Sequence, residues 1–314
     1  MTAWPEALKP EQALVSEIRT CAPENPLIPR GWHSQWEDIW APLAATLANK
    51  INVHKSAGRV PVIGIHGGQG SGKSTLSIAL QEIYRRAFDW NVVIVSIDDL
   101  YLSHADRQAL SVEVHPLLAT RGVPGTHEAT RGLKLFETLR SLKSGESCAI
   151  PAFDKASDDR LPESEWHAIT GPVDAILFEG WCVGCQPVAD ELLSAPVNDL
   201  EANEDPDGIW RGWVNQQLAG QYKDWFATID FLLMLKVPDM SAVKRWRTEQ
   251  EAGNKQQAKG ATDRSLDDAG IRRFIQHYER LTRQALTRLP EIANLVLTIN
   301  DAHKVADVRY GNDS

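Results

Sequence analysis

The glycine-rich segment at residues 67–74, GGQGSGKS, is the feature of this sequence that most restricts its possible folds. It matches the pattern G-x-x-x-x-G-K-[S/T] and follows an apolar, β-branched run at residues 60–65. A helical pattern over residues 74–87 comes directly after it. Between a strand and a helix, such glycines let the backbone curl so that several N–H groups and the helix N-terminus face one anion. A glycine-rich turn alone matches by chance, but this context predicts a phosphate-binding loop.

Apolar runs and helical patterns alternate along the rest of the sequence. After residues 60–65, further apolar runs occupy residues 91–97, 175–178, 229–237 and 294–299. We expect each run to form a strand, and since the run at residues 91–97 is almost wholly apolar, we expect that strand to be buried on both faces. Strands that alternate with helices form parallel sheets covered by helices. We therefore predict an α/β fold of the P-loop NTPase type, with a doubly wound, mainly parallel sheet and helices on both faces.

The N-terminal part of the chain has a different pattern. Trp32, Trp36 and Trp40 recur every four positions and leucines continue the stripe, which indicates one face of a helix. Such a stripe is either a surface for partners or stacked bases, or the face by which a helix packs on a domain. The acidic charge of the chain favours packing. We predict an N-terminal helical extension, residues 1–58, packed on a main domain, residues 59–314.

Two polar stretches interrupt the main domain. Residues 198–208, NDLEANEDPDG, are acidic and rich in turn formers, and we expect a solvated loop there. Residues 250–264 have almost no apolar side chain and follow a basic segment with Arg245 and Arg247. A flexible polar segment after a basic helix is typical of a lid that closes over a site, although plain surface loops are equally common. We predict a lid near residues 244–264.

Composition excludes several classes of function. The formal net charge is -9, so the surface repels nucleic-acid phosphates and anionic lipids, and we expect neither nucleic acid nor membrane as a partner. The apolar stretches are too short to cross a bilayer, and the start lacks the basic and apolar regions of a secretory signal. Four cysteines do not make a disulfide framework in a chain of 314 residues. We expect a cytoplasmic protein with no implied protein partner.

The phosphate loop and two strand ends supply candidate functional residues. Lys73 is expected to reach the β- and γ-phosphates of a nucleotide, and the Ser74 hydroxyl to coordinate Mg²⁺. Asp98 and Glu179 each end an apolar run, and the carboxyl ends of parallel strands border the ligand crevice. There Asp98 is a proton acceptor, a metal ligand or a turn cap, and Glu179 lies near the Mg²⁺. The predicted ATP-binding residues are Gly67, Gly68, Gln69, Gly70, Ser71, Gly72, Lys73, Ser74 and Thr75.

Five segments, in order, carry a resemblance to a known family: GGQGSGKST, SIDDLYLS, HPLLATRGVPGTHE, PAFDK and ILFEGWCVG. They resemble the D-glycerate 3-kinases of plants, fungi and bacteria, which group with uridine kinase, phosphoribulokinase and pantothenate kinase. Residues 121–127 and 179–181 are the most specific parts of the resemblance. The phosphate loop itself is shared with many unrelated proteins.

The resemblance implies roles for the matching residues. Asp98 corresponds to the general base on the acceptor hydroxyl, and Glu179 to the acid near the metal. Arg245 and Arg247 resemble the basic lid segment that, with Lys73, neutralises the transferring phosphoryl group. The residues in motifs that line the acceptor pocket are Asp98, Tyr101, Arg121, His127 and Lys155. We expect Arg121 to bind an acceptor carboxylate, because its planar guanidinium pairs with both oxygens. Glu128 departs from the aspartate expected in the family and leaves the acceptor's identity open.

Together these features imply an enzyme that uses ATP and Mg²⁺ to phosphorylate a small anionic hydroxy acid, D-glycerate, giving 3-phosphoglycerate. A kinase of the same fold can instead act on a nucleoside, a sugar phosphate or pantothenate, for which the pocket needs stacking aromatic rings or additional basic residues. A non-enzymatic nucleotide switch is a more distant alternative, because it needs no aspartate facing a small pocket. The motif at residues 121–127 favours glycerate.

Overall fold

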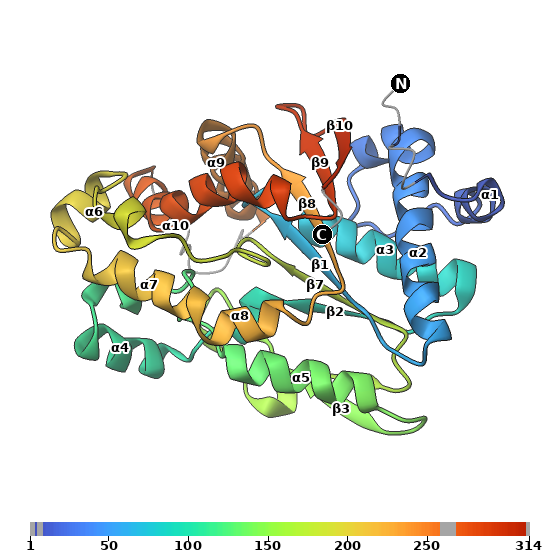
Figure 1. Ribbon diagram of the computed structural model, residues 1–314, viewed down its shortest axis with the longest axis horizontal. Coiled ribbons are helices and arrows are strands. Elements are labelled where there is room, and N and C mark those ends of the chain that lie inside the picture. Colours follow the sequence, from blue (N-terminus) through green and yellow to red (C-terminus); the bar gives the residue numbers. More distant parts are fainter. Residues whose placement is uncertain (1–3, 5–8, 258–267, 312–314) are drawn as a thin grey trace.

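A six-stranded sheet forms the centre of the molecule (Figure 1). The computed structural model describes residues 4, 9–257 and 268–311. The strand order is β10-β9-β8-β1-β7-β2, and every neighbouring pair is parallel except β10 and β9. This arrangement confirms the predicted doubly wound, mainly parallel sheet. The strands of this sheet are β1 (Val62–Gly67), β2 (Val92–Ser96), β7 (Ala175–Gly180), β8 (Phe231–Lys236), β9 (Leu295–Ile299) and β10 (Val305–Tyr310).

Helices cover both faces of the sheet (Figure 1). Side chains from α1 (Gln12–Arg19), α2 (Ala41–Ser56), α3 (Lys73–Phe88) and α9 (Met240–Gln257) share one hydrophobic core with β1, β8 and β9. The other face packs against α5 (Ala129–Ser141), α7 (Ile209–Ala219), α8 (Gln221–Phe226) and α10 (Asp268–Arg288). β1 and β7 lie in the middle of the sheet, and each of their residues is buried, as expected for strands covered on both sides. Within the described residues, no helix is long and apolar enough to cross a membrane.

Smaller elements lie beyond the main sheet. The helices α4 (His104–Glu113) and α6 (Asp199–Glu204) lie near one end of the molecule (Figure 1). Two short antiparallel pairs join β3 (Ser147–Ile150) to β6 (His167–Thr170), and β4 (Phe153–Asp154) to β5 (Asp159–Arg160). The turn between β4 and β5 places residues 155–158 beside the carboxyl end of β2, where they contribute to the site described below.

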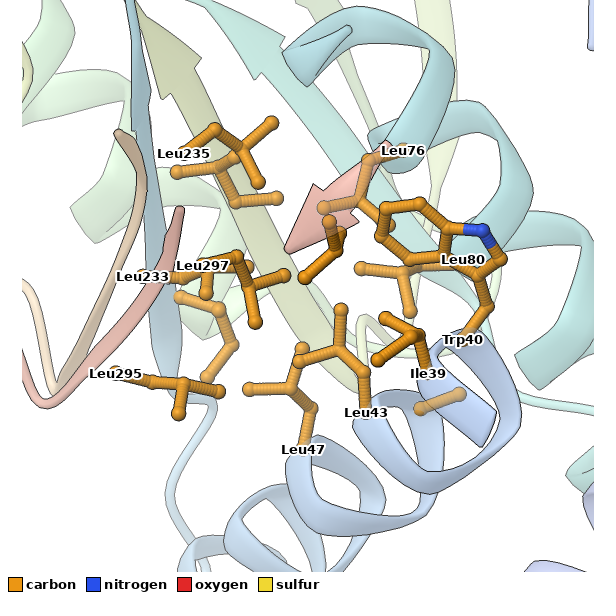
Figure 2. Close-up of a cluster of buried hydrophobic side chains, with 14 of the residues drawn as sticks. Ile39, Trp40, Leu43, Leu47, Leu76, Leu80, Leu233, Leu235, Leu295 and Leu297 are labelled. Carbon is orange, nitrogen blue, oxygen red and sulfur yellow. The ribbon is translucent and has the colours of Figure 1, made fainter. Parts of the chain in front are cut away.

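The N-terminal tryptophans complete the core on one face of the sheet. They do not lie on the single regular helix that their spacing predicts: residues Arg30–Gln35 form a 3₁₀ helix, and Trp36–Trp40 form a π-helical turn that leads into α2. The rings of Trp32 and Trp40 stack with centroids 4.9 Å apart. Figure 2 shows Trp40 beside leucines of α2, α3 and the sheet. The stripe is therefore a packing surface, although its helical geometry is irregular.

The acidic segment 198–208 contains a helix rather than the expected solvated loop. The Asn198 side chain accepts a hydrogen bond of 3.0 Å from Glu201 N and caps α6. The carboxylates of Glu201 and Asp205 are buried. Their negative charges are balanced, since Arg280 pairs with Glu201 and Arg211 with Asp205. The prediction of a loop was wrong because these cationic partners are distant in the sequence.

The predicted lid also differs from the structure. Residues 244–257 belong to the helix α9, whereas a flexible segment was expected from residue 250. Residues 258–264 of the predicted lid lie outside the described residues. The edge strand β10 was not predicted. Its buried residues, Val305 and Val308, are separated by two exposed residues, so its apolar signal is weaker than that of the central strands.

Candidate active site

The phosphate loop connects β1 to α3 at the carboxyl end of the sheet. Gly70 has a φ of 78° and Gly72 a φ of 89°, a left-handed conformation that glycine adopts without steric cost. A Cβ on Gly70 would lie 2.6 Å from Trp246 Cβ in α9, so this position also needs glycine for space. Loop residues border a cavity of about 440 Å³ through Gln69, Gly70, Gly72, Lys73, Ser74 and Thr75. The other predicted loop residues, Gly67, Gly68 and Ser71, do not line this cavity.

Asp98 lines the same cavity as Lys73. It lies in the 3₁₀ turn Ile97–Leu100 that directly follows β2, and its carboxylate borders the same cavity. Oδ1 accepts a hydrogen bond of 3.0 Å from the Tyr101 hydroxyl, and Oδ2 one of 2.6 Å from Lys155 Nζ. Burial raises the pKa of Asp98, but the charges of Lys155 and Lys73 outweigh it and hold the pKa well below its usual value. Asp98 is therefore ionised at neutral pH.

The adjacent carboxyl group behaves in the opposite way. Burial, followed by the negative charge of Asp98, raises the pKa of Asp99 to about 6. Asp99 does not line the cavity. Neighbouring environments thus separate the two pKa values, and the carboxyl group with the lower pKa is the one that borders the cavity.

Glu179 ends β7 beside the phosphate loop. Its Oε1 accepts a hydrogen bond of 2.8 Å from the Ser74 hydroxyl. Its Oε2 lies 3.9 Å from Lys73 Nζ and accepts no hydrogen bond from any described residue, although the side chain is buried. A buried carboxylate oxygen without a hydrogen-bond donor, next to a serine hydroxyl, is suited to a hard cation. Among the described residues no cluster of three or more acidic, histidine or cysteine side chains could hold a metal by itself.

Tyr101, Arg121 and Lys155 line the same cavity as Asp98. The Arg121 guanidinium pairs with Asp158, in the turn between β4 and β5, and lies 5.4 Å from the centroid of the Phe153 ring. The structure therefore brings three of the predicted acceptor residues together with Asp98. Arg121 is not an isolated cation, because Asp158 already occupies one side of its guanidinium.

His127 does not line the cavity, in contrast to its predicted place in the acceptor pocket. It is buried behind Tyr101, and the two rings stack with centroids 4.4 Å apart. Burial lowers the pKa of His127 to about 3, so the imidazole is neutral. The histidine thus contacts a residue of the site rather than the space that a ligand fills.

The two arginines of the basic segment in α9 have different surroundings. Arg247 borders the cavity, and its guanidinium lies 4.9 Å from the centroid of the Phe274 ring. Arg245 does not border it and pairs with Asp301 on the surface. Of the two predicted catalytic arginines, only Arg247 is brought to the site.

Comparison with known proteins identifies the family of this chain. The family model for phosphoribulokinase and uridine kinase matches residues 62–192. An uncharacterised kinase of Schizosaccharomyces pombe is 34% identical over 71% of this chain and 80% of its own length. The chain belongs to this family of P-loop kinases. The chloroplastic D-glycerate 3-kinase of Arabidopsis thaliana is 32% identical over 69% of this chain, which spans 47% of the plant protein.

A solved structure shows the same fold. The D-glycerate 3-kinase of Cryptococcus neoformans superposes with a TM-score of 0.71 and 23% sequence identity. The match covers 87% of this kinase and 99% of the fungal chain.

Sequence reasoning missed several residues that line the site of this kinase. Trp181 follows β7, and its indole N–H donates to the Gly122 carbonyl at 3.1 Å. Phe274 and Tyr278 reach the cavity from α10, and the Tyr278 hydroxyl donates to the Arg121 carbonyl at 3.1 Å. Trp181 belongs to the segment ILFEGWCVG, which carries the family resemblance, so the sequence held a signal for this residue. The two α10 residues had only the apolar periodicity of a packed helix, which does not show which end of the helix borders a cavity.

Glu128, where the family is expected to carry aspartate, lies outside the cavity. Its Oε2 is 2.8 Å from Arg160 and 2.7 Å from Arg131. The additional methylene of a glutamate at this position therefore affects ion pairs behind the site and leaves the cavity lining unchanged.

Proposed function

We propose that this kinase transfers the γ-phosphoryl group of ATP to a hydroxyl group of D-glycerate, with 3-phosphoglycerate as the product. The observation that carries the proposal is the position of an ionised Asp98 on the same cavity as the phosphate-loop lysine, Lys73. A phosphoryl donor site and a proton acceptor that border one cavity are what transfer to a hydroxyl requires. The similarity to proteins named D-glycerate 3-kinase supports glycerate as the acceptor.

The nucleotide phosphates would lie over residues 67–75. Backbone N–H groups of this loop and the N-terminus of α3 favour negative charge there. Ser74 and Glu179 would hold Mg²⁺, since a free carboxylate oxygen and a hydroxyl suit that ion. When bound, Mg²⁺ supplies charge neutralisation for the phosphate oxygens.

The residues of the chain perform the remaining steps. Asp98 accepts the proton of the attacking hydroxyl, for which its lowered pKa keeps it ionised at neutral pH. Lys73 and Arg247 border the space between the loop and Asp98 and neutralise charge on the transferring group. Both cations are held in place before the reaction, so little reorganisation is needed as charge develops.

A single carboxylate on the acceptor matches the charges near Asp98. Two of the cations that line the cavity, Arg121 and Lys155, are each paired with one carboxylate, Asp158 and Asp98 respectively. A carboxylate can share the remaining guanidinium donors of Arg121. An acceptor that carries a phosphate would bring two further negative charges to a region whose cations are already balanced. This arrangement favours a hydroxy acid over a sugar phosphate.

The proposal is tested by coupled ADP release with a panel of acceptors. The panel contains D-glycerate, L-glycerate, uridine, pantothenate and ribulose 5-phosphate, each with ATP and Mg²⁺. We expect turnover with D-glycerate that exceeds the rate without acceptor, and phosphorus NMR of the product identifies which hydroxyl is phosphorylated. Preference for uridine would assign Trp181 and Tyr278 as a stacking surface and overturn the glycerate assignment. Equal ADP release with and without every acceptor would overturn the kinase mechanism.

A further inference from the structure

A buried tyrosine lies behind the site without touching the cavity. Tyr222 belongs to α8, and its side chain is 1% exposed. Its hydroxyl oxygen accepts a hydrogen bond of 2.8 Å from Gly125 N–H and lies 2.6 Å from His127 Nδ1. Gly125 and His127 both belong to the segment 121–127. The hydroxyl thus joins α8 to the loop that carries the acceptor residue Arg121.

The contacts of the Tyr222 hydroxyl favour one arrangement of protons in this pair. The Tyr222 oxygen accepts from Gly125, and among the described residues the acceptor within reach of its own proton is His127 Nδ1. Nδ1 of a neutral imidazole accepts a hydrogen bond only when the ring proton is on Nε2. Burial lowers the pKa of His127 to about 3, which keeps the ring neutral. His127 is therefore held as the Nε2–H tautomer, with Tyr222 as the donor to Nδ1.

The His127 ring is the surface on which Tyr101 rests. The two rings are nearly parallel, with an interplanar angle of 21° and centroids 4.4 Å apart. The backbone keeps them in register, because Leu102 N donates to Thr126 O at 2.9 Å and Glu128 N to Leu100 O at 2.7 Å. The Tyr101 hydroxyl in turn donates to Asp98 Oδ1 at 3.0 Å. A continuous series of contacts therefore runs from Tyr222 through His127 and Tyr101 to Asp98.

We propose that Tyr222 is a positioning residue for phosphoryl transfer: its hydroxyl fixes the His127 ring, and this ring keeps the Tyr101 hydroxyl against the Asp98 carboxylate. The inference rests on the proposed function, in which Asp98 is the proton acceptor. A carboxylate that accepts a proton in the transition state must hold its orientation toward the attacking hydroxyl. Lys155 binds the other carboxylate oxygen but has a side chain that is 60% exposed, so the buried Tyr101 contact restricts Asp98 more strongly.

Tyr222 also packs against Trp225 and Phe226, so a purely structural role must be distinguished from positioning. Tyr222→Phe keeps the ring and removes the hydroxyl. Tyr84→Phe is the matched control, because Tyr84 is fully buried and its hydroxyl donates to Ala44 O at 2.9 Å in the N-terminal core. His127→Phe keeps a ring against Tyr101 and removes the Nδ1 acceptor. The double variant Tyr222→Phe/His127→Phe completes a thermodynamic cycle.

Steady-state kinetics with the acceptor found in the panel, and the midpoint of thermal unfolding, are measured for each variant. We expect Tyr222→Phe to lower kcat on the order of 10-fold to 100-fold with an unchanged KM for ATP, the scale for a misplaced reacting group. Tyr84→Phe should lower the unfolding midpoint similarly and leave kcat unchanged. His127→Phe should match Tyr222→Phe, and the double variant should be no slower than either. A wild-type kcat in folded Tyr222→Phe, or multiplicative losses in the double variant, would overturn the inference.

Nitrogen NMR of histidine-labelled protein gives a test that needs no acceptor. The His127 signals, assigned by their loss in His127→Phe, should show the Nε2–H tautomer in the wild type and lose that preference in Tyr222→Phe. An Nδ1–H tautomer in the wild type would contradict the hydrogen-bond direction on which the inference depends. Failure of the proposed function has a different signature, namely full turnover in Asp98→Asn, so the two failures are distinguishable.

Discussion

Lys155 Nζ lies 2.6 Å from Asp98 Oδ2 at the edge of the cavity, and this ion pair keeps a half-buried carboxylate ionised. The two residues come from different elements: Asp98 from the turn after β2, and Lys155 from the turn between β4 and β5. Without the lysine, the raising effect of burial on the pKa of Asp98 would be opposed mainly by Lys73. The proton affinity of the proposed base therefore depends on a lysine whose side chain is 60% exposed.

Replacement of Lys155 should change the pH dependence of the reaction. Burial raises the pKa of Asp98 and Lys155 lowers it, so Lys155→Met should move this pKa upward. Because only the ionised carboxylate accepts a proton, the acidic limb of the kcat/KM profile should move to higher pH in the variant. The profile is measured by ADP release from about pH 4 to 9, a range in which Asp98 should give the wild type no acidic limb, with the exposed Lys143→Met as control. A Lys155→Met profile that coincides with that of the wild type over this range would exclude the coupling.

Asp98 itself should be needed for turnover and not for nucleotide binding. Asp98→Asn keeps the shape of the side chain and its acceptor for the Tyr101 hydroxyl but removes the basic oxygen. We expect kcat to fall by about 10²-fold or more, the usual scale for a removed general base. Calorimetric titration should show ATP binding within a factor of about three of the wild type, because the phosphate loop is unchanged. Normal turnover in this variant would remove Asp98 from the mechanism.

The sequence predicted the part of the site in which local pattern and position agree. The phosphate loop, Asp98 and Glu179 follow apolar runs, and parallel strands place their carboxyl ends along one edge of the sheet. The central strands were predictable because they are apolar on both faces. The boundaries shifted by one or two residues, as with β1, which is Val62–Gly67 rather than residues 60–65.

Features that depend on distant partners could not be predicted. Segment 198–208 reads as a solvated loop until Arg280 and Arg211 are known to neutralise its buried carboxylates. Arg245 and Arg247 are equally basic in the sequence, and only the packing of α9 shows which of them reaches the cavity. Tyr222 has no sequence signal at all, because its role depends on a contact with the loop at residues 121–127.

Arg121 should determine the affinity for the acceptor. Arg121→Met removes the guanidinium that borders the acceptor end and retains an unbranched apolar side chain. We expect the KM for D-glycerate to rise on the order of 10-fold to 100-fold, the equivalent of about 1.5–3 kcal/mol for a charged hydrogen bond, with little change in the KM for ATP. Arg131→Met is the control, since Arg131 pairs with Glu128 outside the cavity. Equal changes in both KM values would show that Arg121 does not bind the acceptor carboxylate.

The two arginines of α9 should differ in their effect on catalysis. Arg247 borders the cavity, whereas Arg245 pairs with Asp301 at the surface. Arg247→Met should lower kcat on the order of 10²-fold, because a cation fixed near the developing charge is removed. Arg245→Met should lower kcat by less than about twofold, since exposed ion pairs contribute little. Single-turnover measurements with saturating ATP separate this effect from nucleotide binding, and equal losses in both variants would contradict the assignment.

Asp99 should be a source of instability that depends on pH. Burial, followed by the charge of Asp98, raises its pKa to about 6, so the folded state binds a proton that the unfolded chain has already lost. The folded state is therefore penalised as pH rises from about 4 to 6, and the penalty persists above that range. Asp99→Asn removes the charge and should increase the free energy of unfolding at pH 8 by about 2–3 kcal/mol, with no gain at pH 4. Urea denaturation at the two pH values measures this difference. A gain of equal size at both would show that the effect does not come from ionisation of Asp99.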